Sequence, residues 1–178
     1  MIDWKTISST VVHKNPWFSL REDKVIRPDG KDGIFYVMDR PSCVIIVPLS
    51  KDNEVYLIRI NRYTTRNTHW EIPMGSSENQ DKLTAAKREM QEETGLESKN
   101  WIKAGIQEVA NGVTGQIAHI FIAKDVAQTN YYEHEEEGID KIQKFSFSKV
   151  MRMIEENEII DSNAIAALML AGLKLKLI

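Results

Sequence analysis

The stretch from Asp81 to Gly95 constrains this chain more than any other segment, because it combines a clear helical period with an unusual grouping of charge. It consists of good helix formers, with no proline and no glycine before Gly95. Its apolar residues Leu83, Ala86 and Met90 recur at the spacing of one helical face. Asp81 can cap the first turn, and Gly95 can end the helix in a left-handed conformation. The pattern predicts a helix whose apolar side packs against a sheet.

Three carboxylates share another face of this predicted helix. Glu89 lies three residues before Glu92 and four before Glu93, so the three side chains project on the same side. Like charges at these spacings cost roughly 0.2–0.5 kcal/mol per pair in an isolated helix. A divalent cation such as Mg²⁺ would reverse that penalty, because it prefers carboxylate oxygens, water and phosphates as ligands. Arg88, four residues before Glu92, can pair with that carboxylate and orient it.

The rest of the chain predicts an α/β fold. Before residue 40, two alternating segments flank the turn signal Arg27-Pro28-Asp29-Gly30, which is typical of a small antiparallel meander. The apolar run 44–49 is typical of a strand buried on both faces, and 54–60 is predicted to be its hairpin partner. Later strands are predicted at 102–108, 118–123 and 142–146, and later helices at 147–156 and 163–175. Strands interleaved with helices indicate an α/β sandwich.

Composition narrows the class of protein. The 178 residues carry a net charge of −3, which argues against a nucleic-acid-binding protein because such proteins need a surplus of Lys and Arg. Cys43 is the single cysteine, so an intrachain disulfide is impossible. The N-terminus has no apolar stretch of signal-peptide length, and the most apolar run, 164–173, is far shorter than the ~20 residues of a membrane span. We therefore expect a cytoplasmic protein that does not interact with membranes.

The surroundings of the acidic helix resemble a known family. The segment from Gly75 to Leu96 resembles the Nudix box, a loop–helix–loop, and its second half, Arg88 to Leu96, fits that pattern at every specified position. The first half departs from it, because the loop is one residue shorter and Gln80 stands where the pattern has glutamate. The resemblance implies a Nudix-type α/β/α sandwich with a mixed sheet, preceded by an N-terminal antiparallel strand meander. The expected domains are residues 1–40 and 41–178.

The resemblance also implies a metal-dependent pyrophosphohydrolase and assigns roles to residues of the box. Bridging cations neutralise a pyrophosphate and lower the pKa of bound water. The expected ligands of Mg²⁺, with Mn²⁺ as an alternative, are Glu89, Glu92, Glu93 and the backbone carbonyl of Met74, and Glu93 is also expected to be catalytic. Structural roles fall to Gly75, Arg88 and Gly95.

A second acidic segment, 133–140, precedes the last predicted strand. In the ADP-ribose pyrophosphatase branch of the family, a loop glutamate in this region assists the attacking water. Alignment on Ile139 places Glu135 at that position, with Glu136 beside it as the other catalytic candidate. The alternative for each is a solvated acidic loop without a catalytic role.

Several segments outside the box also resemble the ADP-ribose pyrophosphatase branch. These are Trp17-Phe18, the turn 27–31, the strand end 59–63 and the segment 154–161. The resemblance implies an ADP-ribose-like substrate, hydrolysed to AMP and ribose 5-phosphate, and a homodimer formed through the N-terminal meander. Arg59 and Arg62 are candidates for binding phosphate or ribose, Glu71 for accepting a hydrogen bond from the substrate, and Phe18 for stacking on the base.

Other functions stay open at this point. Asn111 stands before Gly112 where the ADP-ribose branch often has a proline, which leaves nucleotide sugars and nucleoside triphosphates as alternative substrates. A Nudix-like module that senses a nucleotide without hydrolysing it is a further alternative. That module would be expected to have lost carboxylates, whereas Glu89, Glu92 and Glu93 are all present.

Overall fold

The computed structural model describes residues 3–78, 80–129 and 137–178. It divides into two compact units. The first comprises Met1–Ser42 together with Glu108–Ile117, and the second comprises Cys43–Gln107 and Ala118–Ile178. The backbone therefore passes from one unit to the other at 42–43, 107–108 and 117–118.

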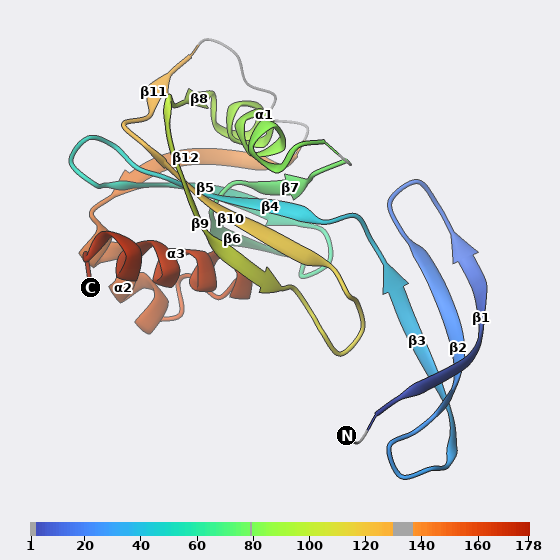
Figure 1. Cartoon of the computed structure of the whole chain (residues 1–178). Coiled ribbons are helices and arrows are strands. Elements are labelled where there is room, and N and C mark those ends of the chain that lie inside the picture. The colour runs from blue at the N-terminus through green and yellow to red at the C-terminus, as the bar shows by residue number, and fades with distance from the viewer. Residues whose placement is uncertain (1–2, 79, 130–136) are drawn as a thin grey trace. The chain divides into compact units, whose positions relative to one another are not determined.

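The first unit contains a three-stranded antiparallel sheet in the order β1-β2-β3 (Figure 1), as the alternating pattern before residue 40 predicts. The strands are β1 (Lys5–Lys14), β2 (Ser19–Ile26) and β3 (Asp32–Asp39). Gly30, in the turn between β2 and β3, has a positive φ of 82°, a conformation that glycine adopts without strain. Every residue of β1 is exposed to solvent.

The segment Glu108–Ile117 is bound to the first unit through the end of β3. The backbone N–H of Met38 donates to the carbonyl of Val113 at 2.8 Å. The side-chain amide of Gln116 donates to the carbonyl of Pro41 at 2.6 Å. These contacts explain why a segment between two strands of the second unit belongs to the first.

The second unit is built on a mixed four-stranded sheet in the order β7-β4-β10-β9. Its strands are β4 (Cys43–Pro48), β7 (Met74–Ser76), β9 (Asn100–Glu108) and β10 (Ile117–Lys124). β4 pairs in parallel with β10 and antiparallel with β7. Residues 44–48 are buried, as expected for an apolar strand covered on both faces.

The predicted hairpin between 44–49 and 54–60 is wrong. Instead, β5 (Val55–Arg62) lies in a second, antiparallel sheet between β12 (Ile139–Phe145) and β6 (Asn67–Glu71), and it meets the end of β4 at an isolated bridge from Leu49 to Val55. β4 takes β10 as its parallel neighbour, as is typical of a strand buried on both faces, and the local turn signal at 51–53 does not reveal this pairing. The short strands β8 (Leu96–Glu97) and β11 (Ala127–Gln128) form a small separate pair.

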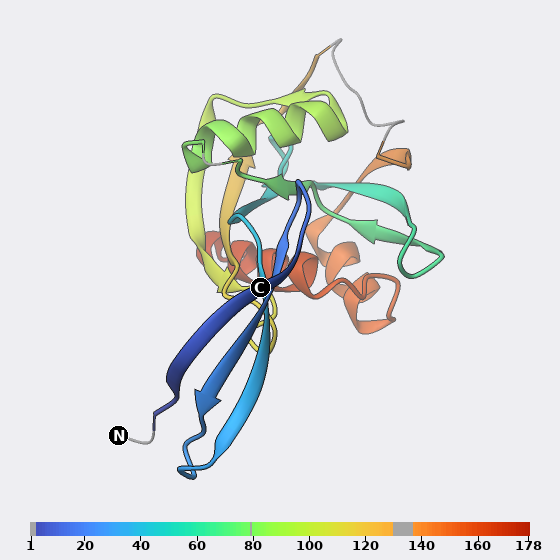
Figure 2. The same cartoon turned by 90° about the vertical axis from the view of Figure 1, so that its right-hand side faces the viewer.

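Helices cover both faces of the mixed sheet, which confirms the expected α/β/α sandwich (Figures 1 and 2). The helix α1 (Lys82–Thr94) packs Ala85, Ala86 and Met90 on residues of β4 and β10, and α3 (Ser162–Leu175) packs against β4 from the other side. The third helix is α2 (Phe147–Glu155). Within the ranges described above, no helix is long and apolar enough to cross a membrane.

The ends of α1 match the sequence prediction. The carboxylate of Asp81 accepts a hydrogen bond from the backbone N–H of Thr84 at 3.0 Å, which caps the first turn. Gly95 ends the helix with φ 66° in the left-handed region. Both caps fix where α1 begins and ends, and hence where its glutamates lie over the sheet.

Candidate active site

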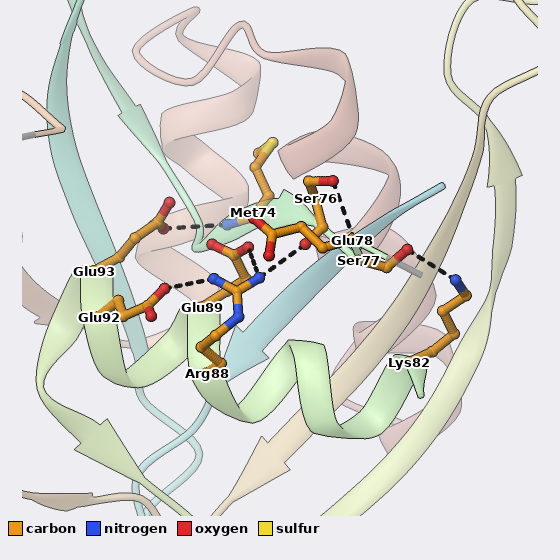
Figure 3. A network of polar contacts seen from close by, with 9 residues as sticks. All are labelled: Met74, Ser76, Ser77, Glu78, Lys82, Arg88, Glu89, Glu92 and Glu93. Atoms are coloured by element: carbon orange, nitrogen blue, oxygen red, sulfur yellow. Dashed lines mark hydrogen bonds and ion pairs between the residues drawn. The ribbon is translucent and has the colours of Figure 1, made fainter. Parts of the chain in front are cut away.

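The three glutamates of α1 lie where the helix faces β7 (Figure 3). Glu89 and Glu93 are buried, at 8% and 5% exposed, and Glu92 is half-buried. The backbone N–H of Met74 donates to the Glu93 carboxylate at 3.2 Å. The helix and the short strand therefore bring together Met74 and the three carboxylates predicted to form the site.

Gly75 has a steric role in this arrangement. It pairs with Val44 of β4, and the carboxylate of Glu89 lies directly over its Cα. A Cβ at residue 75 would overlap the carboxylate of Glu89. The absence of a side chain thus creates the space that the Glu89 carboxylate occupies, which gives a physical reason for glycine at this position.

Arg88 joins two of the carboxylates to the strand. It donates to Glu92 and to Glu89, each at 2.7 Å, and to the backbone carbonyl of Ser76 at 2.9 Å. The pairing with Glu92 confirms the expectation from their four-residue spacing. Arg88 consequently compensates the like charges on this face and fixes α1 to the end of β7.

Burial makes the carboxyls of Glu89 and Glu93 hard to ionise. It raises the pKa of Glu89 to about 7, although the positive charge of Arg88 opposes the rise. Burial also raises the pKa of Glu93 well above its usual range, and the charge of Glu89 adds to that effect. The charge of Glu137, which precedes β12, raises the pKa of both groups as well. A cation at this point would relieve all of these effects at once.

The donor set suits a hard cation that takes few protein ligands. In the part of the chain that the structure describes, no three His, Cys, Asp or Glu side chains are gathered closely enough to hold a metal ion by themselves. Arg88 occupies one oxygen each of Glu89 and Glu92. Mg²⁺ fits such a site, because it retains waters and substrate phosphates among its ligands beside the protein's carboxylates.

The two arginines predicted to bind substrate are both engaged by carboxylates. Arg59 makes a two-pronged contact with Asp140 at 2.8 and 2.7 Å, on an exposed part of the surface. Arg62 makes the equivalent contact with Glu71 at 3.1 and 2.7 Å. Glu71 is only 4% exposed, so the carboxylate of this second pair is buried. The sequence did not indicate either pairing, because the partners come from different strands.

The remaining candidates lie elsewhere. Phe18 is in the first unit, immediately before β2, with its ring centroid 5.7 Å from that of His13. Glu135 and Glu136 lie outside the described residues. Glu137 was given no role from the sequence, although it belongs to the same acidic run and its charge acts on Glu89 and Glu93.

Two family models match the chain. The family model described as the NUDIX domain matches residues 39–168, and the model described as the nucleoside diphosphate sugar hydrolase N-terminal domain matches residues 4–38. The chain belongs to the NUDIX family and is a Nudix hydrolase. Dependence on a divalent metal ion is typical of that family.

Individual relatives span nearly the whole chain. An ADP-ribose pyrophosphatase of Mycobacterium tuberculosis is 28% identical over 94% of this chain and 82% of its own length. An ADP-ribose pyrophosphatase of Bacillus subtilis is 22% identical over 97% and 95%, and a methanol dehydrogenase activator of Bacillus methanolicus is 24% identical over 94% and 91%. The crystal structure of an ADP compounds hydrolase matches with a TM-score of 0.85 at 20% identity, covering 98% of this chain and 95% of that one. This structural likeness confirms the fold.

Proposed function

We propose that this Nudix hydrolase cleaves the pyrophosphate of an ADP-ribose-like compound, releasing AMP and ribose 5-phosphate from ADP-ribose itself. The observation that carries the proposal is the pair of buried carboxylates, Glu89 and Glu93, held on α1 against Gly75 and Met74. Two of the relatives described above are ADP-ribose pyrophosphatases that align over nearly the whole chain, which supports this substrate.

In this proposal, the reaction adds water across the P–O–P bond and leaves one phosphate on each product. Glu89, Glu92, Glu93 and the carbonyl of Met74 would hold Mg²⁺, or Mn²⁺ in its place. The bound cation supplies neutralisation of the pyrophosphate charge and a lower pKa of the attacking water. Arg88 orients two of these carboxylates through its hydrogen bonds to Glu89 and Glu92.

The acidic loop supplies the base in this proposal. Glu135 is assigned to accept the proton of the attacking water, with Glu136 as the adjacent candidate. The next residue, Glu137, supports this proposal, because its charge acts on both Glu89 and Glu93. Proton transfer of this kind contributes typically ~10²–10⁴-fold to the rate, so Glu135→Gln should lower turnover by at least about tenfold.

Substrate contacts and assembly complete the proposal. Arg59 and Arg62 remain candidates for the phosphates or the ribose, Glu71 for a hydrogen bond from the substrate, and Phe18 for the base. Arg59 would have to exchange its exposed contact with Asp140 for the substrate. The N-terminal meander, residues 1–40, is proposed to bind a second copy of the chain. Exposed apolar residues of its sheet support this, among them Ile7, Val11 and Ile34. The same proposal includes the cytoplasmic location expected from the sequence. It also takes a small nucleotide as the binding partner and excludes nucleic acid.

A nucleotide sugar is the second candidate substrate. The match of residues 4–38 to the nucleoside diphosphate sugar hydrolase N-terminal domain favours it. Asn111 before Gly112, in the segment joined to β3 by hydrogen bonds, also departs from the pattern of the ADP-ribose branch. The reaction and the roles of the α1 glutamates are the same for both substrates.

The decisive experiment measures phosphate released from ADP-ribose, nucleotide sugars, dinucleoside polyphosphates, NADH and nucleoside triphosphates. A coupled phosphatase reports the products with Mg²⁺, with Mn²⁺ and with EDTA. We expect metal-dependent release, highest for ADP-ribose. Glu93→Gln should abolish most of it, whereas Glu97→Gln, an exposed glutamate just beyond α1, should not. Full activity of Glu93→Gln with saturating Mg²⁺, or no release from any compound, would contradict the proposal.

Assembly is tested separately by sedimentation of the wild-type protein. A dimer is expected, and Val11→Glu should convert it to monomer, since this residue is 57% exposed on β1. Exposed Lys5 on the same strand gives the matched control, Lys5→Glu. A wild-type monomer at micromolar concentration would refute the role assigned to the first unit.

A further inference from the structure

The loop between β7 and α1 holds a charged residue in an unfavourable backbone conformation. Glu78 has a φ of 45°, in the left-handed region that glycine adopts without cost and that asparagine and aspartate tolerate. Three described residues of other types share this conformation, namely Arg66, Lys176 and Glu78. Arg66 lies in the turn between β5 and β6 and Lys176 ends α3, whereas Glu78 lies beside the carboxylate site (Figure 3). Backbone strain of this kind is concentrated at functional sites.

Three hydrogen bonds fix the loop that carries Glu78. The backbone N–H of Glu78 donates to the hydroxyl of Ser76, the last residue of β7, at 3.2 Å. The backbone N–H of Gln80 donates to the carbonyl of Ser77 at 2.7 Å, which closes the turn. The ammonium group of Lys82, in the first turn of α1, donates to the hydroxyl of the fully buried Ser77 at 2.8 Å. The loop is therefore held by β7 at its start and by α1 at its end.

Ser76 connects Glu78 to the carboxylates of α1. The hydroxyl of Ser76 accepts from Glu78, and its carbonyl accepts from Arg88, which also donates to Glu89. Figure 3 shows the Glu78 side chain directed back over β7, toward the side where Arg88 and Glu89 lie. Glu78 is exposed, so its carboxylate is accessible to water and to a cation bound at this site.

The same loop is where this chain departs from the pattern of the box. Gln80 stands where the pattern has glutamate, so one carboxylate is missing from the expected set. The loop is also one residue shorter than the pattern, which changes the residues that the turn presents to the site. Glu78, two residues before Gln80, is the acidic side chain that this shortened turn directs toward Glu89 (Figure 3).

We propose that Glu78 replaces the missing glutamate of the box and holds the divalent cation through a cation-bound water. This inference rests on the cation site of the proposed function. Mg²⁺ retains several waters, and groups that hold such waters orient a metal site from outside its direct ligands. A contact through water also fits the described residues, in which no three acidic side chains are close enough to hold a metal directly. Glycine would relax the backbone at residue 78, but it would not supply the carboxylate.

The test separates the carboxylate of Glu78 from the strain of its backbone. Glu78→Gln removes the charge and keeps the shape, whereas Glu78→Gly removes both the side chain and the strain. Glu78→Gln combined with Gln80→Glu moves the carboxylate to the position of the box pattern. The control is Lys176→Gly, which relieves the same kind of strain, at a φ of 57°, at the end of α3. For each protein, Mn²⁺ affinity is measured without substrate by the loss of the free-ion electron paramagnetic resonance signal. Thermal unfolding in EDTA and the half-activating Mg²⁺ concentration are measured in parallel.

We expect Glu78→Gln to weaken Mn²⁺ binding and to raise the half-activating Mg²⁺ concentration about tenfold, the lower end of the usual range for a group that acts on a metal through its ligands. Glu78→Gly should lose the same affinity, yet its unfolding temperature in EDTA should rise by ~2–4 °C, because glycine adopts a positive φ without strain. Lys176→Gly should show a similar rise with unchanged Mn²⁺ affinity. The combined variant should recover most of the lost affinity, because a carboxylate is restored to the loop.

Two results would overturn the inference. In the first, Glu78→Gln binds Mn²⁺ within about twofold of the wild type, which would leave the carboxylate without a role at the cation site. In the second, the combined variant recovers no affinity, which would show that Glu78 does not replace the missing glutamate of the box. Failure of the proposed function is distinguishable from both, because it would be seen as a wild-type protein that releases no phosphate. The Mn²⁺ measurement needs no substrate and would still report on Glu78.

Discussion

Glu89→Gln is expected to stabilise the metal-free protein at alkaline pH while removing its activity. The folded environment raises the pKa of Glu89 from 4.5 to about 7, chiefly through burial. The folded protein therefore binds this proton more tightly than the unfolded chain does. The free energy of unfolding should fall as the pH rises from about 4.5 to about 7 and then remain low.

The size of this change in unfolding free energy follows from the same rise in the pKa of Glu89. At about 1.4 kcal/mol for each pH unit, the ionised Glu89 side chain costs the folded protein about 3 kcal/mol at pH 8. Glutamine has nearly the same shape and carries no charge. Arg88 keeps its contacts with Glu92 and with the carbonyl of Ser76, so its own charge stays compensated. The substitution should therefore recover up to about 3 kcal/mol at pH 8 and under about 1 kcal/mol at pH 5.

Urea unfolding in EDTA at pH 5 and at pH 8 measures this difference directly. The exposed substitution Glu97→Gln is the control and should change the unfolding free energy equally little at both pH values. The same Glu89→Gln protein should show little metal-dependent phosphate release. The reasoning would be refuted if Glu89→Gln destabilised the protein at pH 8, or if its gain were the same at both pH values.

Three further substitutions test individual features of the box. Gly75→Ala should displace the carboxylate of Glu89, because the added Cβ would overlap it. The variant should lose metal-dependent activity far more than stability. Activity equal to that of the wild type would show that the overlap is relieved without displacing Glu89 from its function. Gly95→Ala should cost about 1 kcal/mol in urea unfolding, because residue 95 has a φ of 66°, and a smaller change than ~0.3 kcal/mol would contradict the strain argument. Asp81→Ala should cost about 1 kcal/mol in the same assay through loss of the cap on Thr84, and Asp81→Asn, which can still cap, should cost much less.

The features that local chemistry determines were predictable from the sequence. The limits of α1 follow from a capping aspartate and a left-handed glycine, and both are found where the sequence places them. The meander of the first unit follows from alternation around a turn that contains Gly30. The contact of Arg88 with Glu92 follows from helical spacing alone.

The features that depend on partners distant in the sequence could not be predicted from it. The hairpin between β4 and β5 was wrong because the choice of a strand partner depends on burial of the whole sheet, while the turn at 51–53 is compatible with either outcome. The carboxylate set could be named from spacing, but the overlap of Glu89 with the space over Gly75 could not. The pairing of Arg62 with Glu71 was equally hidden, because a nine-residue separation across two strands has no periodic signature.

The segment Glu108–Ile117 determines whether the N-terminal part of this protein can be deleted or transferred to another protein. Residues 4–38 match a family model of their own, yet the unit that contains them also needs a piece of chain from between β9 and β10. Three covalent tethers therefore join the two units, where an ordinary N-terminal extension would have one. Deleting residues 1–42 would leave Val113 and Gln116 without Met38 and Pro41, so the remaining segment would lose its docking site. Grafting 4–38 onto another enzyme would carry over only part of the unit. The N-terminal sheet is thus not a portable module, and recombination that exchanged it would have to exchange the 108–117 loop with it.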